Sequence, residues 1–234
     1  GWGGAPAARD LVRRMREMGV HLFTNYGLTE GGAVVSATGP DDGIDDLAGT
    51  VGRPNDSGDY QIVDDHGRAV GAGQAGEIWL KGPGVFLGYW NNPAATAAAM
   101  APGGWLRTSD VALARPDGAW VLSGRKADMF KSGGFNVYPR EIEQALEEHP
   151  DVAYAAVISV PDPRYFEVGA AFVAAKPGCS PTPAEIDAFL RERLANYKVP
   201  KTIQVRDTLP MLPIGKVDKH ALRDDLARAD VSGA

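Results

Sequence analysis

Residues 124–143 have the sequence Gly124-Arg125-Lys126-Ala127-Asp128-Met129-Phe130-Lys131-Ser132-Gly133-Gly134-Phe135-Asn136-Val137-Tyr138-Pro139-Arg140-Glu141-Ile142-Glu143, and the character of the chain changes twice within them. Residues 119–123, just before this stretch, are typical of a short strand. Residues 139–148 are typical of a helix, because proline suits the first helical position and apolar residues then recur at helical spacing. The stretch therefore predicts a loop between a strand and a helix.

This loop combines a glycine pair with positive charge. Gly133 and Gly134 let the backbone approach a ligand closely or adopt positive φ, and Arg125, Lys126 and Lys131 are the cations beside them. Such a loop suits an anion such as a phosphate. A solvated turn whose lysines face water explains these residues equally well, since short glycine motifs are common.

Composition sets the broad class. The 234 residues are 44% hydrophobic and 23% charged, which is typical of one or two globular domains, and a net charge of -6 argues against a nucleic-acid partner. Cys179 is alone and the four histidines lack ligand spacing, so neither a disulfide nor a structural zinc site is expected. No membrane span or signal peptide is recognisable, which favours a cytoplasmic protein.

Three further segments could carry chemistry. Residues 25–32 follow an expected buried strand at 21–24, and they place Thr29 and Glu30 where a strand ends in a cleft, although a turn with a helix cap fits as well. Asp110 ends another strand, where a carboxylate could accept hydrogen bonds from ribose hydroxyls or simply form a hairpin turn. Lys216 lies on a loop bounded by proline and glycine, and it could equally be a solvated charge.

The remaining pattern predicts an α+β fold. We expect hairpins of a β-rich subdomain between residues 39 and 76, a strand at 77–81, and a loop at 82–93 whose Tyr89 and Trp90 anchor it to the core. Helices are expected at 6–18, 94–100, 183–194 and 219–228, and strands at 152–160 and 170–175.

Together and in this order, the motifs resemble signatures of the adenylate-forming superfamily, which includes acyl-CoA synthetases, luciferases and peptide-synthetase adenylation domains. The resemblance extends over nearly the whole chain. It implies that residues 1–123 are the end of a large AMP-binding domain and residues 124–234 a small mobile lid domain. The hinge would lie near residues 125–128, at Ala127.

The resemblance also implies residue roles. Tyr26 would stack on adenine, Thr29 would contact the α-phosphate, Glu30 would hold Mg²⁺, Asp110 would bind the ribose, and Lys216 would be the adenylation lysine. The residues implied to bind ATP or AMP are Asn25, Tyr26, Gly27, Leu28, Thr29, Asp110, Arg125 and Lys216, and the implied catalytic residues are Thr29, Glu30 and Lys216. The residues implied to bind coenzyme A are Gly133, Gly134, Phe135 and Lys198. The implied acyl pocket is lined by Gly4, Ala5, Asn25 and Gly27.

The implied reaction has two steps. A small-molecule carboxylic acid reacts with MgATP to give an acyl-adenylate, and the thiol of coenzyme A then displaces AMP. Three alternatives stay open: a carrier-protein thiol as the acceptor, an aminoacyl adenylate as the product, and a non-catalytic nucleotide-binding or interaction module derived from such enzymes.

The chain departs from the family pattern at four places. Ala127 stands where Asp or Lys is usual, and Ser109 and Phe166 each stand where glycine is usual. The Ser/Thr/Gly-rich loop that grips the ATP phosphates is absent, and we expect it in a missing N-terminal part of the same enzyme, ahead of Gly1.

We therefore predict that these 234 residues alone do not catalyse the conversion of an acid and ATP to products. An acid-dependent assay of AMP formation on the chain as given should show only background. Clear turnover would refute the fragment interpretation.

Overall fold

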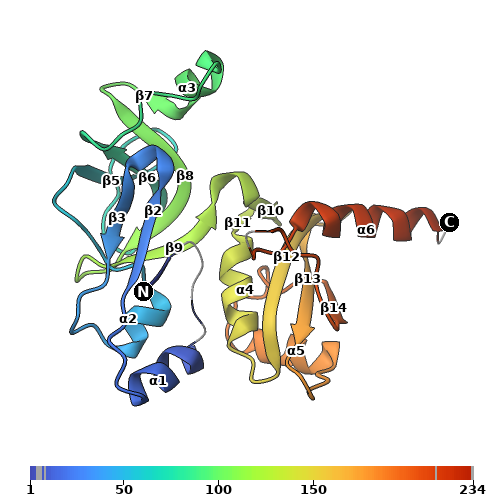
Figure 1. Cartoon of the computed structure of the whole chain (residues 1–234). Helices are drawn as coiled ribbons and strands as arrows, with labels where there is room; N and C mark the ends of the chain where they lie inside the picture. The colour runs from blue at the N-terminus through green and yellow to red at the C-terminus, as the bar shows by residue number, and fades with distance from the viewer. Residues whose placement is uncertain (4–6, 8, 214, 233–234) are drawn as a thin grey trace. The chain divides into compact units, whose positions relative to one another are not determined.

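The computed structural model describes residues 1–3, 7, 9–213 and 215–232, with side chains up to residue 228. The chain divides into two compact units, Gly1–Ala127 (unit 1) and Asp128–Ala234 (unit 2), which are described separately (Figure 1). Each unit contains both helices and sheets. Among the described residues, no helix is long and apolar enough to cross a membrane.

Unit 1 contains two sheets. The first has the order β1-β2-β3-β4, formed by β1 (Trp2–Gly3), β2 (Thr24–Leu28), β3 (Ala33–Ala37) and β4 (Arg53–Pro54). The second has the order β5-β6-β8-β7 with β9 paired to β8, formed by β5 (Asp59–Val63), β6 (Ala75–Lys81), β7 (Met100–Ala101), β8 (Trp105–Ala114) and β9 (Trp120–Arg125). The helices are α1 (Arg9–Glu17), α2 (Ile44–Gly49) and α3 (Pro93–Ala99), with short 3-10 turns η1 (Thr29–Gly31) and η2 (Lys126–Asp128).

Three expectations for unit 1 are wrong. Asp110 does not end a strand, because β8 continues past it to Ala114 through an irregularity in its pairing with the neighbouring strands. The strand expected at residues 21–24 begins only at Thr24, because Leu22 is buried against Val12 of α1 and Leu47 of α2 instead of pairing in a sheet. Trp90 does not anchor its loop, since it is 92% exposed. Tyr89 is 41% exposed, and its ring makes an edge contact with that of Phe86, with ring centroids 4.9 Å apart.

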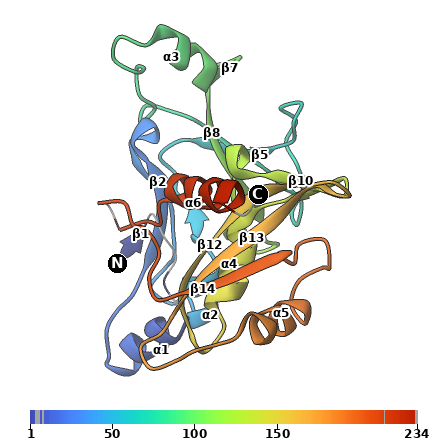
Figure 2. The ribbon, with the colours of Figure 1, turned by 90° about the vertical axis from the view of Figure 1, so that its right-hand side faces the viewer.

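Unit 2 is one sheet covered on both faces. Its order is β11-β10-β13-β12 with β14 parallel to β13, formed by β10 (Phe130–Ser132), β11 (Phe135–Val137), β12 (Val152–Asp162), β13 (Phe166–Ala175) and β14 (Thr202–Arg206). Figure 2 shows β12, β13 and β14 side by side. The helices are α4 (Pro139–Glu147), α5 (Pro183–Arg191) and α6 (Lys219–Ser232).

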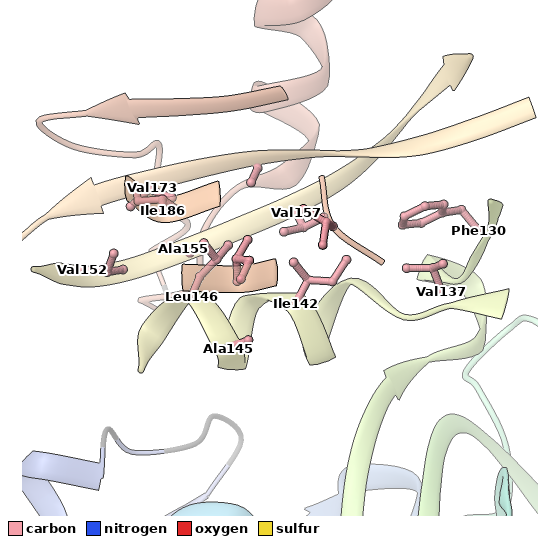
Figure 3. Packing of buried hydrophobic residues seen from close by; sticks show 13 residues of the cluster. Phe130, Val137, Ile142, Ala145, Leu146, Val152, Ala155, Val157, Val173 and Ile186 are labelled. Atoms are coloured by element: carbon pink, nitrogen blue, oxygen red, sulfur yellow. The ribbon is translucent and has the colours of Figure 1, made fainter. Parts of the chain in front are cut away.

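Alternate residues of β12 and β13 feed two cores, because successive side chains of a strand point to opposite faces. Ala155 and Val157 of β12 pack with Ile142 and Leu146 of α4 (Figure 3), whereas Phe172 of β13 faces the other core with Leu222 of α6. A strand that is buried on both faces has a continuous run of apolar residues in its sequence. This is why β12 and β13 could be predicted from the sequence.

The glycine pair forms the turn of the β10–β11 hairpin. Ser132 pairs with Phe135 across it, and Gly133 and Gly134 have φ of 56° and 89°. Two residues of positive φ in a two-residue hairpin match a type I′ turn, which favours glycine at both positions. The hairpin alone thus gives a backbone reason for the pair.

Two positions where the resemblance noted above leads us to expect glycine have positive φ. Ser109 has φ 61° and Phe166 has φ 68°, a left-handed conformation that costs a non-glycine residue about 1–2 kcal/mol. Phe166 begins β13 and is 82% exposed, so its ring gains little burial in return.

We predict that Phe166→Gly stabilises unit 2 by roughly 0.5–1 kcal/mol, which is the strain relieved less the added backbone entropy of glycine in the unfolded chain. Urea unfolding followed by far-UV circular dichroism measures this change. Phe166→Ala is the matched control, because it removes the ring but keeps the strain. All five tryptophans lie in unit 1, so tryptophan fluorescence reports separately on that unit. Equal stability of the two variants would contradict strain at this residue.

Candidate nucleotide site

Three side chains from separate strands of unit 1 meet at one carboxylate. The Tyr26 hydroxyl donates to Oδ2 of Asp110 at 2.7 Å, and Nε of Arg125 donates to Oδ1 at 3.2 Å. Tyr26 and Asp110 are 84 positions apart in sequence. The Asp110 side chain is 13% exposed and that of Arg125 is 66% exposed, so the cluster is buried on one side and open on the other.

Irregular pairing of β8 aims Asp110. Glu77 of β6 pairs with Val111 and Trp79 pairs with Arg107, so the three residues from Thr108 to Asp110 oppose a single residue of β6. A second irregularity follows in the pairing with β9, where Asp110 lies opposite Arg125. Bulges of this kind redirect side chains next to functional sites.

The environment keeps Tyr26 protonated. Burial, the charge of Asp110 and the hydrogen bond to Asp110 all raise the pKa of Tyr26 above its ordinary value. Its hydroxyl is therefore a dependable donor to the carboxylate. The residue is only 7% exposed and belongs to the core of unit 1, which leaves little of its ring for stacking on a base.

An open depression of about 550 Å³ adjoins the same strand. It is lined by Asn25, Gly27, Leu28, Thr29, Gly32, Ala33 and Val34. Gly27 has a structural reason of its own, because a Cβ there would lie 1.6 Å from the carbonyl oxygen of Ala33. Thr29 is exposed at the start of η1, where its hydroxyl can reach a ligand.

Glu30 lies in η1 beside this depression and is partly buried. Its Oε1 accepts a hydrogen bond from the Tyr89 hydroxyl at 2.8 Å, which fixes the carboxylate. Among the residues that the structure describes, no three His, Cys, Asp or Glu side chains gather as metal ligands. A single carboxylate nevertheless fits Mg²⁺, which proteins commonly hold through one or two carboxylates together with substrate phosphates.

Two of the three cations expected around the glycine pair, Arg125 and Lys126, pair with carboxylates of unit 1. Arg125 binds Asp110, and Nζ of Lys126 lies 2.8 Å from Asp65 and 3.6 Å from Glu77, all in unit 1. The hydrogen bond to Asp65 raises the pKa of Lys126. The expected anion site built from all three cations and the glycines is therefore not formed within either unit.

Sequence reasoning missed Glu77. It is an acidic residue in the strand of Ile78 and Leu80, and it is only 8% exposed. A charge within an apolar strand was the signal that could have revealed it.

The boundary between the two units falls directly after Ala127, the residue expected at the hinge.

In unit 2, two of the residues assigned to coenzyme A come together. Phe135 stacks on Tyr197 with ring centroids 4.5 Å apart, and the neighbouring Lys198 binds Glu141 of α4. Lys216 lies in a turn closed by its own carbonyl and the Leu212 amide at 2.7 Å. Its ammonium is exposed and contacts no charged side chain among those described. The acyl-pocket residues Gly4 and Ala5 lie outside the described residues.

Comparisons with known proteins give a consistent result. A family model for AMP-binding enzymes matches residues 1–90, and one for the AMP-binding enzyme C-terminal domain matches residues 141–216. The chain belongs to the family of AMP-binding enzymes. Its similarity to adenylate-forming acid ligases thus extends across both units, and the expected α+β fold is confirmed.

Similar proteins include curated ligases and a solved structure. The chain is 42% identical to the 3-[(3aS,4S,7aS)-7a-methyl-1,5-dioxo-octahydro-1H-inden-4-yl]propanoyl:CoA ligase of Mycobacterium tuberculosis, and the match covers 95% of this chain and 42% of that ligase. It is 40% identical to the 2-succinylbenzoate--CoA ligase of Geobacillus kaustophilus, and the match covers 94% of this chain and 44% of that ligase. The solved structure of an amide bond synthetase from Marinactinospora thermotolerans superposes on this chain with a TM-score of 0.86 at 39% identity. The match covers 95% of this chain and 46% of the synthetase. The chain spans less than half the length of these relatives.

We predict that Tyr26 makes folding of unit 1 sensitive to alkaline pH. Its pKa is raised in the folded state, so the unfolded state loses its proton first, and the associated stability is present below about pH 10 and declines above it. In Tyr26→Phe the free energy of unfolding should fall less steeply above pH 10, by up to about 1.4 kcal/mol per pH unit.

Urea unfolding followed by tryptophan fluorescence measures this slope. Tyr60→Phe is the control, because Tyr60 packs against the same core but its hydroxyl donates to the Asn55 amide oxygen instead of a carboxylate. Identical pH slopes for Tyr26→Phe and the unmodified chain would contradict the Tyr26–Asp110 hydrogen bond.

Proposed function

We propose that this chain belongs to an AMP-forming acid-thiol ligase, which activates a carboxylic acid with ATP and transfers the acyl group to the thiol of coenzyme A. The observation that carries the proposal is the convergence of Tyr26, Asp110 and Arg125, with Tyr26 on the same strand, β2, that contributes to the depression at Thr29. Membership of the AMP-binding family supports it.

Asp110 has the chemistry of a ribose site. A carboxylate offers about four acceptor positions, and Tyr26 and Arg125 use only one on each oxygen. Both oxygens can therefore still accept a ribose hydroxyl. Arg125 is largely exposed, so it can turn toward a phosphate or the ribose at little cost to its own solvation, while Asp110 keeps the hydrogen bond from Tyr26.

The first step must overcome repulsion between a carboxylate and the ATP phosphates. Two unit charges about 4 Å apart repel by about 4 kcal/mol at an effective dielectric near 20. The exposed ammonium of Lys216 would offset this repulsion during adenylation, and Thr29 would orient the α-phosphate. Glu30 would hold Mg²⁺, whose positive charge neutralises the phosphates when it is bound.

The second step needs a path for the thiol. A Cβ on Gly134 would meet no atom within 4 Å, so there is open space at the tip of the hairpin. We propose that the narrow thiol-bearing arm of coenzyme A passes there. Phe135 and Lys198 supply an aromatic face and a cation for the nucleotide of coenzyme A. We propose that Ala127 is the pivot at which lid motion separates the two half-reactions.

Other acceptors are compatible with the same first step. A carrier-protein thiol is one, and similarity to an amide bond synthetase adds an amine as another. Product formation from a preformed acyl-adenylate with free coenzyme A, loaded carrier protein or amine as the acceptor distinguishes these candidates.

The central test is binding of AMP to this chain, measured by titration calorimetry. We predict that Asp110→Asn weakens AMP binding by about tenfold or more, because hydrogen bonds to a charged acceptor are worth about 1–2 kcal/mol more than those to a neutral one. Asparagine has the shape of aspartate and can still accept from Tyr26.

Asp59→Asn, at an exposed position of β5, is the matched control and should bind AMP normally. Unchanged affinity in Asp110→Asn would contradict the ribose role. Absence of AMP binding to the unmodified chain would favour the non-catalytic module instead.

A further inference from the structure

Glu77 is a buried carboxylate for which no role in the reaction has been assigned. It is 8% exposed, and a charge in that position is costly unless it is paired and hydrogen-bonded. Its Oε1 accepts a hydrogen bond from the Ser109 backbone N–H at 3.0 Å, and its Oε2 lies 3.6 Å from Nζ of Lys126. Both partners are next to residues of the nucleotide site.

The first partner holds the bulge that aims Asp110. Ser109 has φ 61°, which serine adopts only at a cost in strain, and the Glu77 carboxylate offsets that cost by accepting its N–H. On either side, the Thr108 hydroxyl donates to the Ile78 carbonyl at 2.8 Å and accepts from the Asp110 N–H at 3.0 Å. The bulge is thus fastened to β6 at two successive residues, Glu77 and Ile78.

The second partner lies on the other strand of the site. Lys126 follows Arg125, which pairs directly with Asp110 between β8 and β9. Glu77 therefore contacts a neighbour of each member of the Asp110–Arg125 pair. Asp65 also binds Lys126, but it lies in a turn and its side chain is 79% exposed.

From these contacts we propose that Glu77 is a positioning residue of the nucleotide site, which holds Ser109 in the left-handed conformation so that the Asp110 carboxylate faces its ligand. The inference rests on the proposed ribose role of Asp110. It goes beyond that role because it assigns the geometry of the site to a residue that does not touch the nucleotide.

The test compares two substitutions of Glu77. Glu77→Gln keeps an oxygen that can accept from Ser109, and Glu77→Met keeps the length of the side chain but removes the acceptor. We expect Glu77→Met to weaken AMP binding about tenfold or more and Glu77→Gln to change it by less than about threefold. Asp65→Asn, which affects only the exposed partner of Lys126, should leave the affinity unchanged.

A second background separates positioning from a general loss of stability. Glycine adopts positive φ without strain, so Ser109→Gly should make the bulge less dependent on Glu77. In that background, Glu77→Met should weaken AMP binding by less than about threefold. An equal loss of affinity in both backgrounds, or no loss in either, would overturn the proposal.

Amide hydrogen exchange at Ser109 provides a readout that needs no ligand. Exchange should be slow in the unmodified chain and in Glu77→Gln, and fast in Glu77→Met. If the chain fails to bind AMP, the ribose role fails, but this exchange pattern still decides whether Glu77 holds Ser109. Fast exchange at Ser109 in the unmodified chain would overturn the proposal even if Glu77→Met does not fold.

Discussion

The hydrogen bond between the Tyr26 hydroxyl and the Asp110 carboxylate joins the two sheets of unit 1 at the candidate nucleotide site. Tyr26 is buried in the core, so it does not ionise readily, and its hydroxyl holds the Asp110 carboxylate while leaving acceptor positions on both oxygens. Arg125 balances the charge from the solvent side. The site therefore combines a rigid buried donor with an adaptable exposed one.

The two units solve different structural problems. Unit 2 is stabilised by a sheet with apolar side chains on both faces, between α4 and α5 on one side and α6 on the other. Unit 1 instead uses bulges in β8 to turn a polar side chain out of a sheet that is otherwise regular. Backbone strain is accepted at Ser109 because neighbouring polar groups hold it in place.

Sequence alone predicted the elements with strong periodicity. The helix after Pro139 and the two long apolar strands of unit 2 were recognisable, whereas β14 was missed because its residues are only partly buried. Asp110 and Arg125 were identified through the family motifs, but no local pattern could show that they form a pair with Tyr26. Glu77 was missed because its partners, Ser109 and Lys126, are brought to it only by strand pairing.

A crystal structure of this chain with AMP tests the central claim most directly. The account predicts both ribose hydroxyls within hydrogen-bond distance of the Asp110 carboxylate, with Tyr26 still donating to the same group. It would be contradicted by AMP bound away from Asp110, or by a ribose held through other residues while the Asp110 carboxylate contacts only Tyr26 and Arg125.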